Sequence, residues 1–472
     1  MKIYDKFYIN GQWVAPLSGQ FHDINNPATN QPCARTPLAN ENDVKVAIEA
    51  ARAAFPGWSQ SSAKERSNFI HAAADVMERR INEFTSAISE TMGCPLHITK
   101  DLHVKGSIDA FRSFAKLAYS MEEIQEKDSF IQLREPVGVC TLINPWNYPL
   151  SQLVGKLGPA LAAGCTVVAK PAEQTPLQDF LIAEILDSIG LPAGVFNLIT
   201  GSGAKLGKTL CGHPEVDMVS FTGSTAAGVK ISQAAAPTIK RVCLELGGKS
   251  PYIITEDADI ATAVRYGVED VMLNTGQTCN ALTRMLVPQS RYEEILEIAT
   301  AVAEENVVAD PKNSESTMGP MCSEAQKQTV QGYIDKGLAE GARLITGGLE
   351  MPDGLSSGAY VRPTIFADVS NEMCIAREEI FGPVLCIIPY IDLENAIEIA
   401  NDTVFGLSSA VYAKDKKAAL KIASHLRAGQ CFVQAGYFTT DAPFGGYKQS
   451  GNGREWGEEG LAEYVETKAV IG

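Results

Sequence analysis

Cys279 stands in a short polar stretch, Asn274-Thr275-Gly276-Gln277-Thr278-Cys279-Asn280, which follows a predicted helix over about residues 258–273. Glycine and polar neighbours are not the usual packing partners of a core cysteine, and backbone amides in such a loop can stabilise charge on or near a sulfur. We therefore take Cys279 as a candidate nucleophile. The alternative is a buried thiol that acts as a small hydrophobic residue, and in a chain with eleven cysteines the local context alone leaves both open.

Six further motifs accompany this cysteine in chain order. They are Ile143-Asn144-Pro145-Trp146-Asn147-Tyr148-Pro149, Lys170-Pro171-Ala172-Glu173, Phe221-Thr222-Gly223-Ser224, Leu244-Glu245-Leu246-Gly247-Gly248, Glu379-Ile380-Phe381-Gly382-Pro383 and Pro443-Phe444-Gly445-Gly446-Tyr447-Lys448. Each string is weak by itself. Together, in this order, they resemble the NAD(P)-dependent aldehyde dehydrogenase superfamily over almost the whole chain, from about Tyr8 to Lys468.

The resemblance implies three catalytic residues. Cys279 attacks the aldehyde carbonyl, and the side-chain amide of Asn147 stabilises the resulting oxyanion together with the backbone N–H of Cys279. Collapse of this adduct by hydride transfer leaves a thioester, and Glu245 is the general base that activates water to hydrolyse it. Without the resemblance, Asn147 reads as a turn residue and Glu245 as a strand-end carboxylate in a salt bridge.

The implied cofactor is NAD, with NADP used less efficiently. The segment from Gly223 to Gly228 begins a helix after a strand, so its N-terminal amides can face a pyrophosphate. Glu173 can accept hydrogen bonds from both ribose hydroxyls but repels a 2′-phosphate, which favours NAD. The positions that match the family's cofactor site are Ile143, Pro145, Trp146, Lys170, Glu173, Gly203, Phe221, Gly223, Ser224, Leu246, Glu379 and Phe381. Lys448 is assigned a structural role.

The substrate approach is expected along five positions, which are Tyr148, Gly155, Thr278, Asn280 and Phe438. Many relatives that oxidise small aldehydes carry an indole at the position of Gly155, so we expect a wider tunnel here. No arginine stands at the five positions to pair with a substrate carboxylate. The small-molecule substrate is therefore predicted to be a medium-chain aliphatic or aromatic aldehyde.

Two alternative functions follow from the same residues. Relatives that pass the acyl group to coenzyme A generally lack a glutamate at the position of Glu245, so its presence favours hydrolysis to the free acid. A non-catalytic structural protein on the same scaffold would tolerate loss of the nucleophile. The joint presence of Cys279, Glu245 and Asn147 argues against that reading.

Short apolar runs alternate with helical stretches from residue 138 onward. The predicted strands are Gly138–Ile143, Thr166–Lys170, Val195–Ile199, Met218–Phe221 and Val242–Leu246. This alternation indicates parallel βαβ units in a doubly wound α/β sheet, and ligands of such sheets bind beyond the carboxyl ends of the strands. The motifs at Asn147, Lys170, Gly223 and Glu245 all fall at these ends, which predicts one common site.

The expected fold is aldehyde dehydrogenase-like: a Rossmann-type cofactor domain, an α/β catalytic domain and a small β oligomerisation arm. We assign residues 1–120 and 137–247 to the NAD-binding domain and 248–447 to the catalytic domain. By resemblance, segments 121–136 and 460–472 form oligomerisation strands, and a surface hairpin is the alternative for the first of them. A homodimer or a homotetramer is expected.

Two other motifs fail on inspection. Gly201, Gly203 and Gly207-Lys208-Thr209 follow a strand, but a phosphate-binding P-loop needs about four residues between its first glycine and Gly-Lys-Thr. Here Gly201 leaves five residues and Gly203 leaves three. Gly354-Leu355-Ser356-Ser357-Gly358 matches the serine-hydrolase nucleophile string, but Pro352-Asp353 precedes it and strand-like residues 359–361 follow, so a surface loop is predicted.

Composition excludes several partner classes. The chain has 472 residues with a formal net charge of −16 and interspersed signs, which argues against a nucleic-acid surface or an anionic-membrane anchor. No signal-peptide pattern or membrane-length apolar run is present, so a cytoplasmic location with reduced thiols is expected. The six histidines show no metal-ligand spacing, and no metal is expected.

Overall fold

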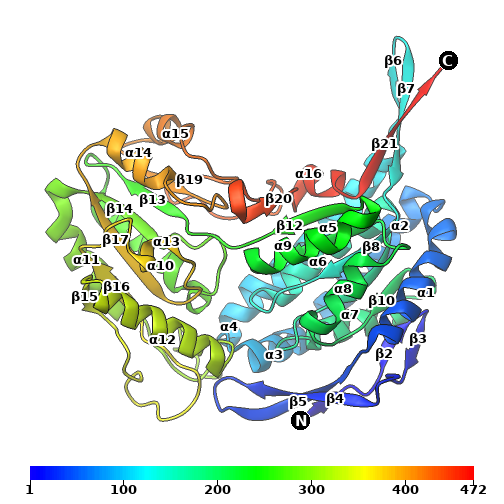
Figure 1. Ribbon diagram of the computed structural model, residues 1–472, viewed down its shortest axis with the longest axis horizontal. Helices are drawn as coiled ribbons and strands as arrows, with labels where there is room; N and C mark the ends of the chain where they lie inside the picture. The colour runs from blue at the N-terminus through cyan, green and yellow to red at the C-terminus, as the bar shows by residue number, and fades with distance from the viewer.

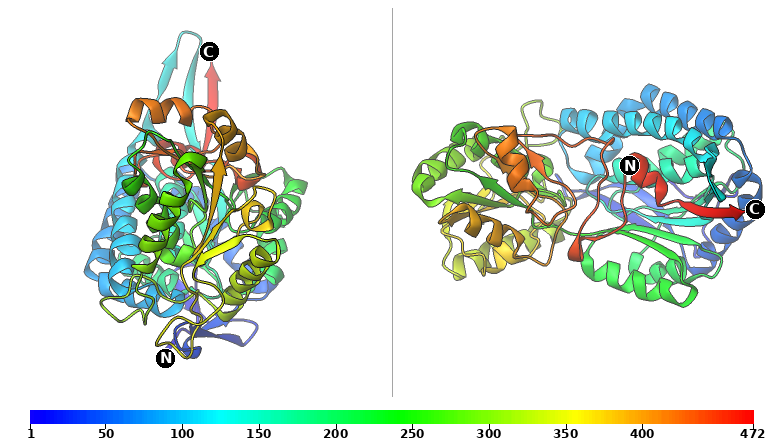
Figure 2. Two further views of the ribbon diagram at one scale, coloured as in Figure 1. Left: turned by 90° about the vertical axis from the view of Figure 1, so that its left-hand side faces the viewer. Right: turned by 90° about the horizontal axis from the view of Figure 1, so that it is seen from above.

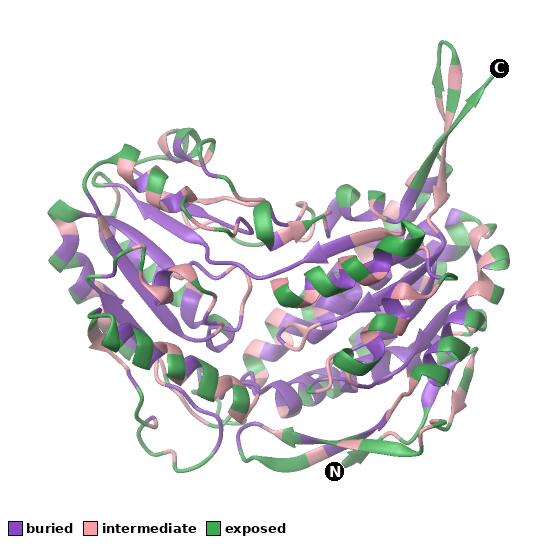
Figure 3. Ribbon diagram, in the orientation of Figure 1, coloured by how far each residue is buried: buried purple, intermediate pink, exposed green.

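The computed structural model describes residues 1–472, and it shows two α/β lobes side by side with a narrow β arm that projects from the first lobe (Figures 1 and 2). The central strands of both large sheets are buried, whereas the arm is exposed or partly exposed along most of its length (Figure 3). None of the helices combines the length and apolarity needed to cross a membrane. All eleven cysteines are free thiols.

The first lobe is built on an eight-stranded sheet in the order β20-β12-β11-β8-β9-β10-β2-β3. Its five central strands are parallel: β8 (Val139–Ile143), β9 (Thr166–Lys170), β10 (Phe196–Leu198), β11 (Met218–Thr222) and β12 (Arg241–Glu245). Antiparallel strands close the two edges: β2 (Phe7–Ile9) with β3 (Gln12–Val14), and β20 (Gly451–Asn452). The five predicted strands are confirmed, and β2 and β3 form a hairpin around Asn10-Gly11.

Strands β8, β9 and β11 are buried at every residue, because helices cover both faces of the sheet. The covering helices that follow the strands are α6 (Pro149–Ala163), α7 (Leu177–Ser188), α8 (Gly203–Gly212) and α9 (Thr225–Ala235). After β8 the chain adds β9 and β10 on one side and then crosses to β11 on the other side. The carboxyl ends of β8 and β11 therefore flank a topological switch point, where doubly wound sheets bind ligands.

A helical layer precedes these strands, as the Ala-rich sequence up to about Ala118 predicts. It consists of α1 (Glu41–Ser59), α2 (Ala63–Arg79), α3 (Ile81–Met92), α4 (Leu96–Ile98), a π-helical turn η1 (Thr99–Lys105), α5 (Gly106–Leu117) and η2 (Ala118–Glu122). Asn40 and Asp43 form a reciprocal capping box that fixes the start of α1. Helices α2 and α5 pack on α6 and enclose the largest apolar cluster of the protein.

The second lobe contains a seven-stranded sheet in the order β15-β16-β17-β14-β13-β18-β19. The strands are β13 (Pro251–Ile254), β14 (Arg284–Pro288), β15 (Arg343–Thr346), β16 (Thr364–Ala367), β17 (Val384–Tyr390), β18 (Ala410–Tyr412) and β19 (Phe432–Val433). Only β15 is antiparallel to its neighbour. The extended residues 359–361, expected to be strand-like, are in no strand, because pairing with β17 begins only at Thr364.

Helices cover this second sheet as well. They are α10 (Ile260–Met272), η5 (Gln289–Arg291), α11 (Tyr292–Glu304), α12 (Glu324–Ala339), α13 (Cys374–Arg377), α14 (Leu393–Asn401) and α15 (Lys416–Ala423). Helix α10 confirms the element predicted just before the Cys279 loop. Asp259 caps it by accepting a hydrogen bond from the backbone of Thr262, which sets its first residue two positions later than expected.

The arm is a three-stranded antiparallel sheet of β6 (Gln125–Lys127), β7 (Phe130–Pro136) and β21 (Val465–Ile471). Segments 121–136 and 460–472 are thus paired with one another, and β21 is exposed beyond Val465. A separate small sheet near the N-terminus contains β1 (Lys2–Ile3), β4 (Gln20–Asn26) and β5 (Gln31–Leu38). The remaining elements are η3 (Ala236–Thr238), η4 (Leu273–Gly276), η6 (Lys448–Ser450) and α16 (Gly457–Ala462).

Candidate active site

The Cys279 loop begins with strained backbone. Asn274 and Thr275 have φ values of 54° and 57°, which is unusual for a β-branched threonine, and Gly276 continues at 70°. A Cβ atom at Gly276 would lie 2.1 Å from the backbone of Gly382, so only glycine fits there. The loop therefore turns back sharply at the end of α10 and presents Cys279 between the lobes.

Gln277 holds this strained loop in place. Its buried side chain donates to the carbonyl of Asn274 at 3.1 Å and accepts from the backbone N–H of Cys322 at 2.8 Å. Thr275 Oγ1 also donates to the carbonyl of Gly319 at 3.2 Å. The sequence pointed to the cysteine and did not single out Gln277, whose importance depends on the distant segment around Cys322.

Asn147 is joined directly to the same loop. Its Nδ2 donates to the carbonyl of Gln277 at 3.0 Å, and Asn274 Nδ2 donates to the carbonyl of Asn147 at 3.0 Å. Asn147 lies just beyond β8, and Pro149 at the first turn of α6 restricts the connection between them. The structure thus brings together two motifs that the sequence separates widely.

Cys279 is half-buried and packs against the large apolar cluster of the first lobe. Burial raises the pKa of its thiol well above the usual range, and the nearby carboxylates of Glu379 and Glu245 raise it further. The backbone amide acts in the opposite direction but more weakly. The loop amide therefore favours the thiolate, as expected, but burial and the neighbouring carboxylates outweigh it.

Glu245 is the last residue of β12 and points into the interior. Neither carboxylate oxygen has a hydrogen-bond partner in the protein, and burial followed by the charge of Glu455 raises its pKa well above normal. A Cβ atom at Gly445 would lie 2.8 Å from Glu245 Oε1, so that glycine leaves room for the carboxylate. Farther along the same segment, a Cβ at Gly248 would lie 2.3 Å from the carbonyl oxygen of Cys279, so the two motifs are in close contact.

A buried ion pair next to Glu245 was not anticipated from the sequence. Lys156 Nζ lies 2.7 Å from a carboxylate oxygen of Glu455, and it also donates to Thr222 Oγ1 at 2.7 Å and to Gln152 Oε1 at 3.0 Å. The Lys156 charge opposes the rise in the pKa of Glu245 that Glu455 causes. The available signal was that Lys156 is the single charged residue of the mostly apolar helix α6.

Two of the expected cofactor positions meet across the lobes. The rings of Trp146, from the first lobe, and Phe381, from the second, pack edge to face with centroids 5.2 Å apart. Glu379 accepts a hydrogen bond from the backbone N–H of Gly248 at 2.9 Å, and its burial raises its pKa to about 7. Glu379 therefore comes from the second lobe to the end of β12, beside the Cys279 loop.

The end of β11 carries a second group of expected cofactor positions. Ser224 caps α9, because its Oγ accepts a hydrogen bond from the backbone N–H of Ala227 at 3.3 Å. The side chain of Leu246 packs beneath Gly228, where a Cβ would lie 2.9 Å from it, and the ring of Phe221 occupies the space at Gly223. Helix α9 therefore begins directly after the carboxyl end of β11, so the amides of its first turn lie at the switch point.

The third group lies at the ends of β9 and β10. Lys170 Nζ donates to the carbonyls of Pro171 at 2.6 Å and Gly201 at 3.1 Å, and burial lowers its pKa to about 8. Glu173 is half-buried, and its charge opposes this lowering. The nearest heavy atom to a Cβ at Gly203 is Lys170 Cε at 4.0 Å, so open space remains beside the lysine. Ile143 ends β8 beside Lys170, and Pro145 follows in the same turn.

The expected substrate positions gather near the thiol. The hydroxyls of Tyr148 and Thr278 are hydrogen-bonded at 2.9 Å, and the ring of Tyr148 stacks on the buried imidazole of His103 at 4.7 Å. Phe438 is 46% exposed and packs edge to face against Phe444. Asn280 is half-buried and follows Cys279 directly.

Gly155 departs from the expectation of a wider tunnel. A Cβ atom at Gly155 would lie 2.9 Å from the indole of Trp456, so the space above this glycine is already filled. Trp456 lies between the expected catalytic domain, which ends at residue 447, and the expected arm segment 460–472, so the sequence assigned it no part in the site. The indole of Trp456 thus fills the space that a side chain at residue 155 of α6 would otherwise occupy.

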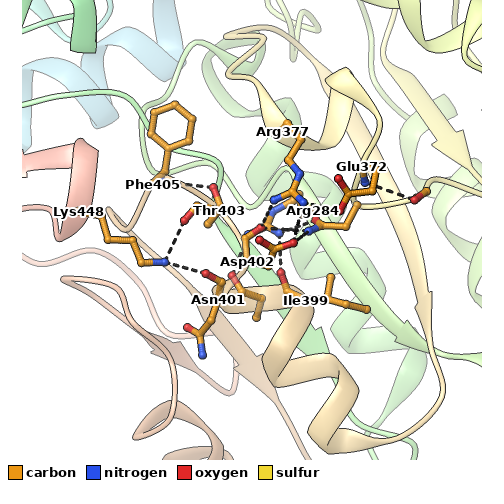
Figure 4. Close-up of polar contacts among 12 residues, drawn as sticks. Arg284, Glu372, Arg377, Ile399, Asn401, Asp402, Thr403, Phe405 and Lys448 are labelled. Atoms are coloured by element: carbon orange, nitrogen blue, oxygen red, sulfur yellow. Dashed lines mark hydrogen bonds and ion pairs between the residues drawn. The ribbon is translucent and has the colours of Figure 1, made fainter.

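Lys448 lies away from this site, in a polar cluster at the end of α14 (Figure 4). Its Nζ donates to the carbonyls of Asn401 at 2.8 Å and Thr403 at 3.1 Å, while Arg284 donates to the carbonyl of Ile399 at 2.9 Å. Cationic donors satisfy the carbonyls that a helix leaves free at its C-terminus. These contacts are consistent with the structural role assigned to Lys448.

The two rejected motifs are not built as their functions require. Gly203 opens α8, but the helix has no side-chain cap and the P-loop spacing is absent. Gly354 to Gly358 lies in a loop with no adjoining strand or helix, as predicted. Neither adds a second candidate site.

Comparison with known proteins identifies the family. Residues 13–470 match the model of the aldehyde dehydrogenase family. The 3-succinoylsemialdehyde-pyridine dehydrogenase of a Pseudomonas species is 48% identical over 100% of this chain and 99% of its own. Aldehyde dehydrogenase C of Pseudomonas syringae, crystallised as a cysteine-to-alanine variant with NAD+ and octanal, is 45% identical with a TM-score of 0.97, over 99% of this chain and 96% of its own. The Mycobacterium tuberculosis aldehyde dehydrogenase crystallised with NAD+ is 42% identical with a TM-score of 0.97, over 100% of this chain and 98% of its own. This chain belongs to the aldehyde dehydrogenase family.

Proposed function

We propose that this protein oxidises an aldehyde to the carboxylic acid with NAD, through a covalent intermediate on Cys279. One observation carries the proposal. Asn147 and Glu245, which lie at the ends of β8 and β12, both meet the Cys279 loop, one through the Gln277 carbonyl and the other through the adjoining Gly248. A half-buried nucleophile, an amide donor and a buried base brought together in this way are the groups that acyl chemistry on sulfur needs.

The residues at the switch point suit a dinucleotide. The free amides at the start of α9 match a pyrophosphate, the open space beside Lys170 and Glu173 matches a ribose, and the Trp146–Phe381 pair borders the region near Cys279. Relatives crystallised with NAD+ have nearly the same fold. When bound, NAD supplies the hydride acceptor for the oxidation.

The protein's own residues handle the protons and the oxyanion. The Cys279 thiol releases its proton to solvent, and the sulfur then bonds to the aldehyde carbon. The amide of Asn147 and the backbone N–H of Cys279 donate to the oxygen that becomes negative. After oxidation to the thioester, Glu245 takes a proton from water as the water oxygen bonds to the acyl carbon, and it returns this proton to the Cys279 sulfur as the carbon–sulfur bond breaks. The buried Lys156–Glu455 pair sets the charge around Glu245 during both proton transfers.

The product is proposed to be the free acid rather than an acyl-coenzyme A. A base with two unpartnered oxygens at Glu245 favours attack by water. The substrate is proposed to be a medium-chain aliphatic or an aromatic aldehyde, because Tyr148, Phe438 and Phe444 supply apolar surfaces near the thiol. Octanal, crystallised with the Pseudomonas syringae relative, is a medium-chain aliphatic aldehyde, and the substrate named for the Pseudomonas relative combines a pyridine ring with a semialdehyde chain.

The arm is proposed to mediate assembly into a homodimer or homotetramer. Its strand β21 has no neighbour on one side, and Ile131, Val470 and Ile471 are exposed on the sheet. An open strand edge with exposed apolar residues is suited to pairing with a second copy of the chain. Light scattering of the full chain and of a variant lacking residues 465–472 tests this, and a monomeric full chain would contradict it.

Steady-state formation of reduced NAD with a graded series of aldehydes tests the function. We expect activity with NAD on unbranched aldehydes and on benzaldehyde, with the acid as product and no requirement for coenzyme A. Cys279→Ala should be inactive while still binding NAD. A wild-type enzyme that reduces no NAD with any of these aldehydes, or that releases product only when coenzyme A is added, would overturn the proposal.

A further inference from the structure

Two consecutive residues of α6 face two consecutive residues of the C-terminal segment. Lys156 forms a buried ion pair with Glu455, and Gly155 lies under the indole of Trp456. Helix α16, which Trp456 precedes directly, packs against α5 and α6 (Figure 1). The ionic pair fixes the register of this contact, so the indole cannot slide along α6 without breaking the ion pair.

Trp456 holds this position at a conformational cost. Its φ of 65° and ψ of 160° lie in a region that glycine alone occupies readily, yet the residue is the largest of the amino acids. The side chain is 4% exposed and sits between two other rings. It stacks on Phe114 with centroids 6.0 Å apart and meets Phe438 edge to face at 6.2 Å. Because this strained backbone places an indole in an aromatic cluster, we infer that the protein requires a large aromatic side chain at this position.

The cluster extends from Trp456 toward the nucleophile. Phe438 packs edge to face on Phe444, and the same apolar cluster that contains Trp456 and Phe444 packs against Cys279. Trp456 and Phe438 therefore belong to one apolar surface, in which Trp456 is the buried part and Phe438 is the exposed part. A substrate chain that extends away from Cys279 along Phe438 would meet this surface.

We infer that Trp456 is a specificity-determining residue, and that Trp456 and Gly155 form a reciprocal pair that sets how long or broad an aldehyde the site accepts. Because Trp456 fills the space between α6 and the C-terminal segment, residue 155 on α6 must be small. A large side chain at residue 155 with a small one at residue 456 would fill the same space from the side of α6. The inference rests on the proposed aldehyde oxidation and adds the wall that limits its substrate. In this inference, the medium size of the predicted aldehydes results from the space that Trp456 fills, and not from an empty space at Gly155.

Trp456→Leu is the main test, with Trp456→Gly as a second variant that the backbone conformation accommodates without strain. The measurement is kcat/KM for unbranched aldehydes of two to twelve carbons with saturating NAD. In the wild type, kcat/KM should rise about fourfold per methylene until the chain reaches the wall. In both variants the rise should continue for about two more carbons, so the ratio of kcat/KM for the longest to the medium chains increases about sixteenfold.

Trp58→Leu is the matched control, because Trp58 is also a buried tryptophan of the first lobe but lies on α1 and packs against Phe69. It should lower thermal stability while leaving the wild-type chain-length profile in place. Gly155→Trp alone should be destabilised by its overlap with Trp456. The double variant Gly155→Trp/Trp456→Leu should recover both the melting temperature and a profile that ends at medium or shorter chains.

The outcomes separate this inference from the function on which it rests. If the wild type oxidises no aldehyde, the proposed function fails. If the wild type oxidises aldehydes but both Trp456 variants retain its chain-length profile, the function stands and the inference is wrong. A double variant no more stable than Gly155→Trp alone would likewise refute the reciprocal pairing.

Discussion

The side-chain amide of Asn147 donates to the carbonyl of Gln277 at 3.0 Å, across 130 positions of sequence. One of the two Nδ2 hydrogens of Asn147 is therefore committed to the backbone of the nucleophile loop, and the other is available to a substrate oxygen. Because Gln277 also anchors the loop to Cys322, the donor and the nucleophile are held as one unit. A preorganised donor of this kind loses little free energy to rearrangement during the reaction.

Asn147→Ala should lower kcat by roughly 10² to 10³. The expected KM for NAD changes little, because the amide contacts the Cys279 loop and not the switch point. Steady-state kinetics with NAD and one good aldehyde check this, and Thr175→Ala, a nearby change that removes a hydroxyl bonded to the carbonyl of Trp146, serves as the control. An Asn147→Ala enzyme with wild-type kcat would remove Asn147 from the oxyanion site.

Glu245→Gln should slow deacylation far more than acylation. The isosteric amide keeps the shape of the pocket but cannot accept a proton from water. Enzyme mixed with aldehyde and NAD should accumulate an acyl-thioester, visible by mass spectrometry as an added acyl mass on the peptide that contains Cys279. Detection of unmodified protein alone during turnover would contradict the assignment of Glu245 as the base for hydrolysis.

Much of this arrangement was predictable because strand ends in a parallel sheet meet at one edge. The apolar runs around Val139–Ile143 and Arg241–Glu245 predicted their strands, and the motifs that follow them were correctly expected at their carboxyl ends. The order of the motifs, together with the resemblance, indicated the family. These features are local in sequence or repeat a known pattern.

The remaining features depend on contacts between distant segments. Glu455 and Trp456 belong to a stretch that carries no sequence signal linking it to α6, yet they meet Lys156 and Gly155 there. An absent side chain at Gly155 indicates open space only if nothing else fills it, and the sequence does not show what packs above a glycine. The raised pKa of Cys279 follows from burial and neighbouring carboxylates, which likewise depend on tertiary packing.

Lys156 and Glu455 should shift the pH dependence of activity in opposite directions. Glu245 must be deprotonated to act as a base, so the acid limb of kcat follows its pKa. The positive charge of Lys156 lowers that pKa and the negative charge of Glu455 raises it. Lys156→Met should therefore move the acid limb of the kcat–pH profile to higher pH, and Glu455→Gln should move it to lower pH. Shifts in the same direction, or none, would contradict the electrostatic coupling.

Both variants also break a buried ion pair, and the partner left behind remains unpaired in the interior. Each single variant should lose about 3 to 5 kcal/mol of stability. The double variant Lys156→Met/Glu455→Gln leaves no unpaired charge and should be more stable than either single one. Thermal unfolding measures this coupling, and equal melting temperatures for the single and double variants would show that the pair is not effectively buried.

Glu173 should give a preference for NAD over NADP. Its carboxylate and a 2′-phosphate repel one another by about 4 kcal/mol per unit charge at about 4 Å and an effective dielectric of about 20, and Lys170 offsets part of this. We therefore expect the enzyme to prefer NAD but still to use NADP. Glu173→Gln should narrow the ratio of kcat/KM for the two cofactors by about tenfold, since this corresponds to about 1.4 kcal/mol. A ratio near one in the wild type would remove the basis of this prediction.

His103 should make the protein sensitive to acid. Its imidazole is buried and stacks on Tyr148, and burial lowers its pKa from 6.5 to about 4. A depressed pKa in the folded state means that the unfolded chain binds the proton more tightly, so the stability due to the neutral imidazole is complete above pH 6.5 and is lost as the pH falls toward 4. The loss amounts to about 3 kcal/mol. His103→Phe keeps a stacked ring without a titrating group, so its melting temperature relative to wild type should rise as the pH is lowered through this range. A constant difference between the two proteins from neutral pH to pH 4 would show that His103 does not titrate as its burial predicts.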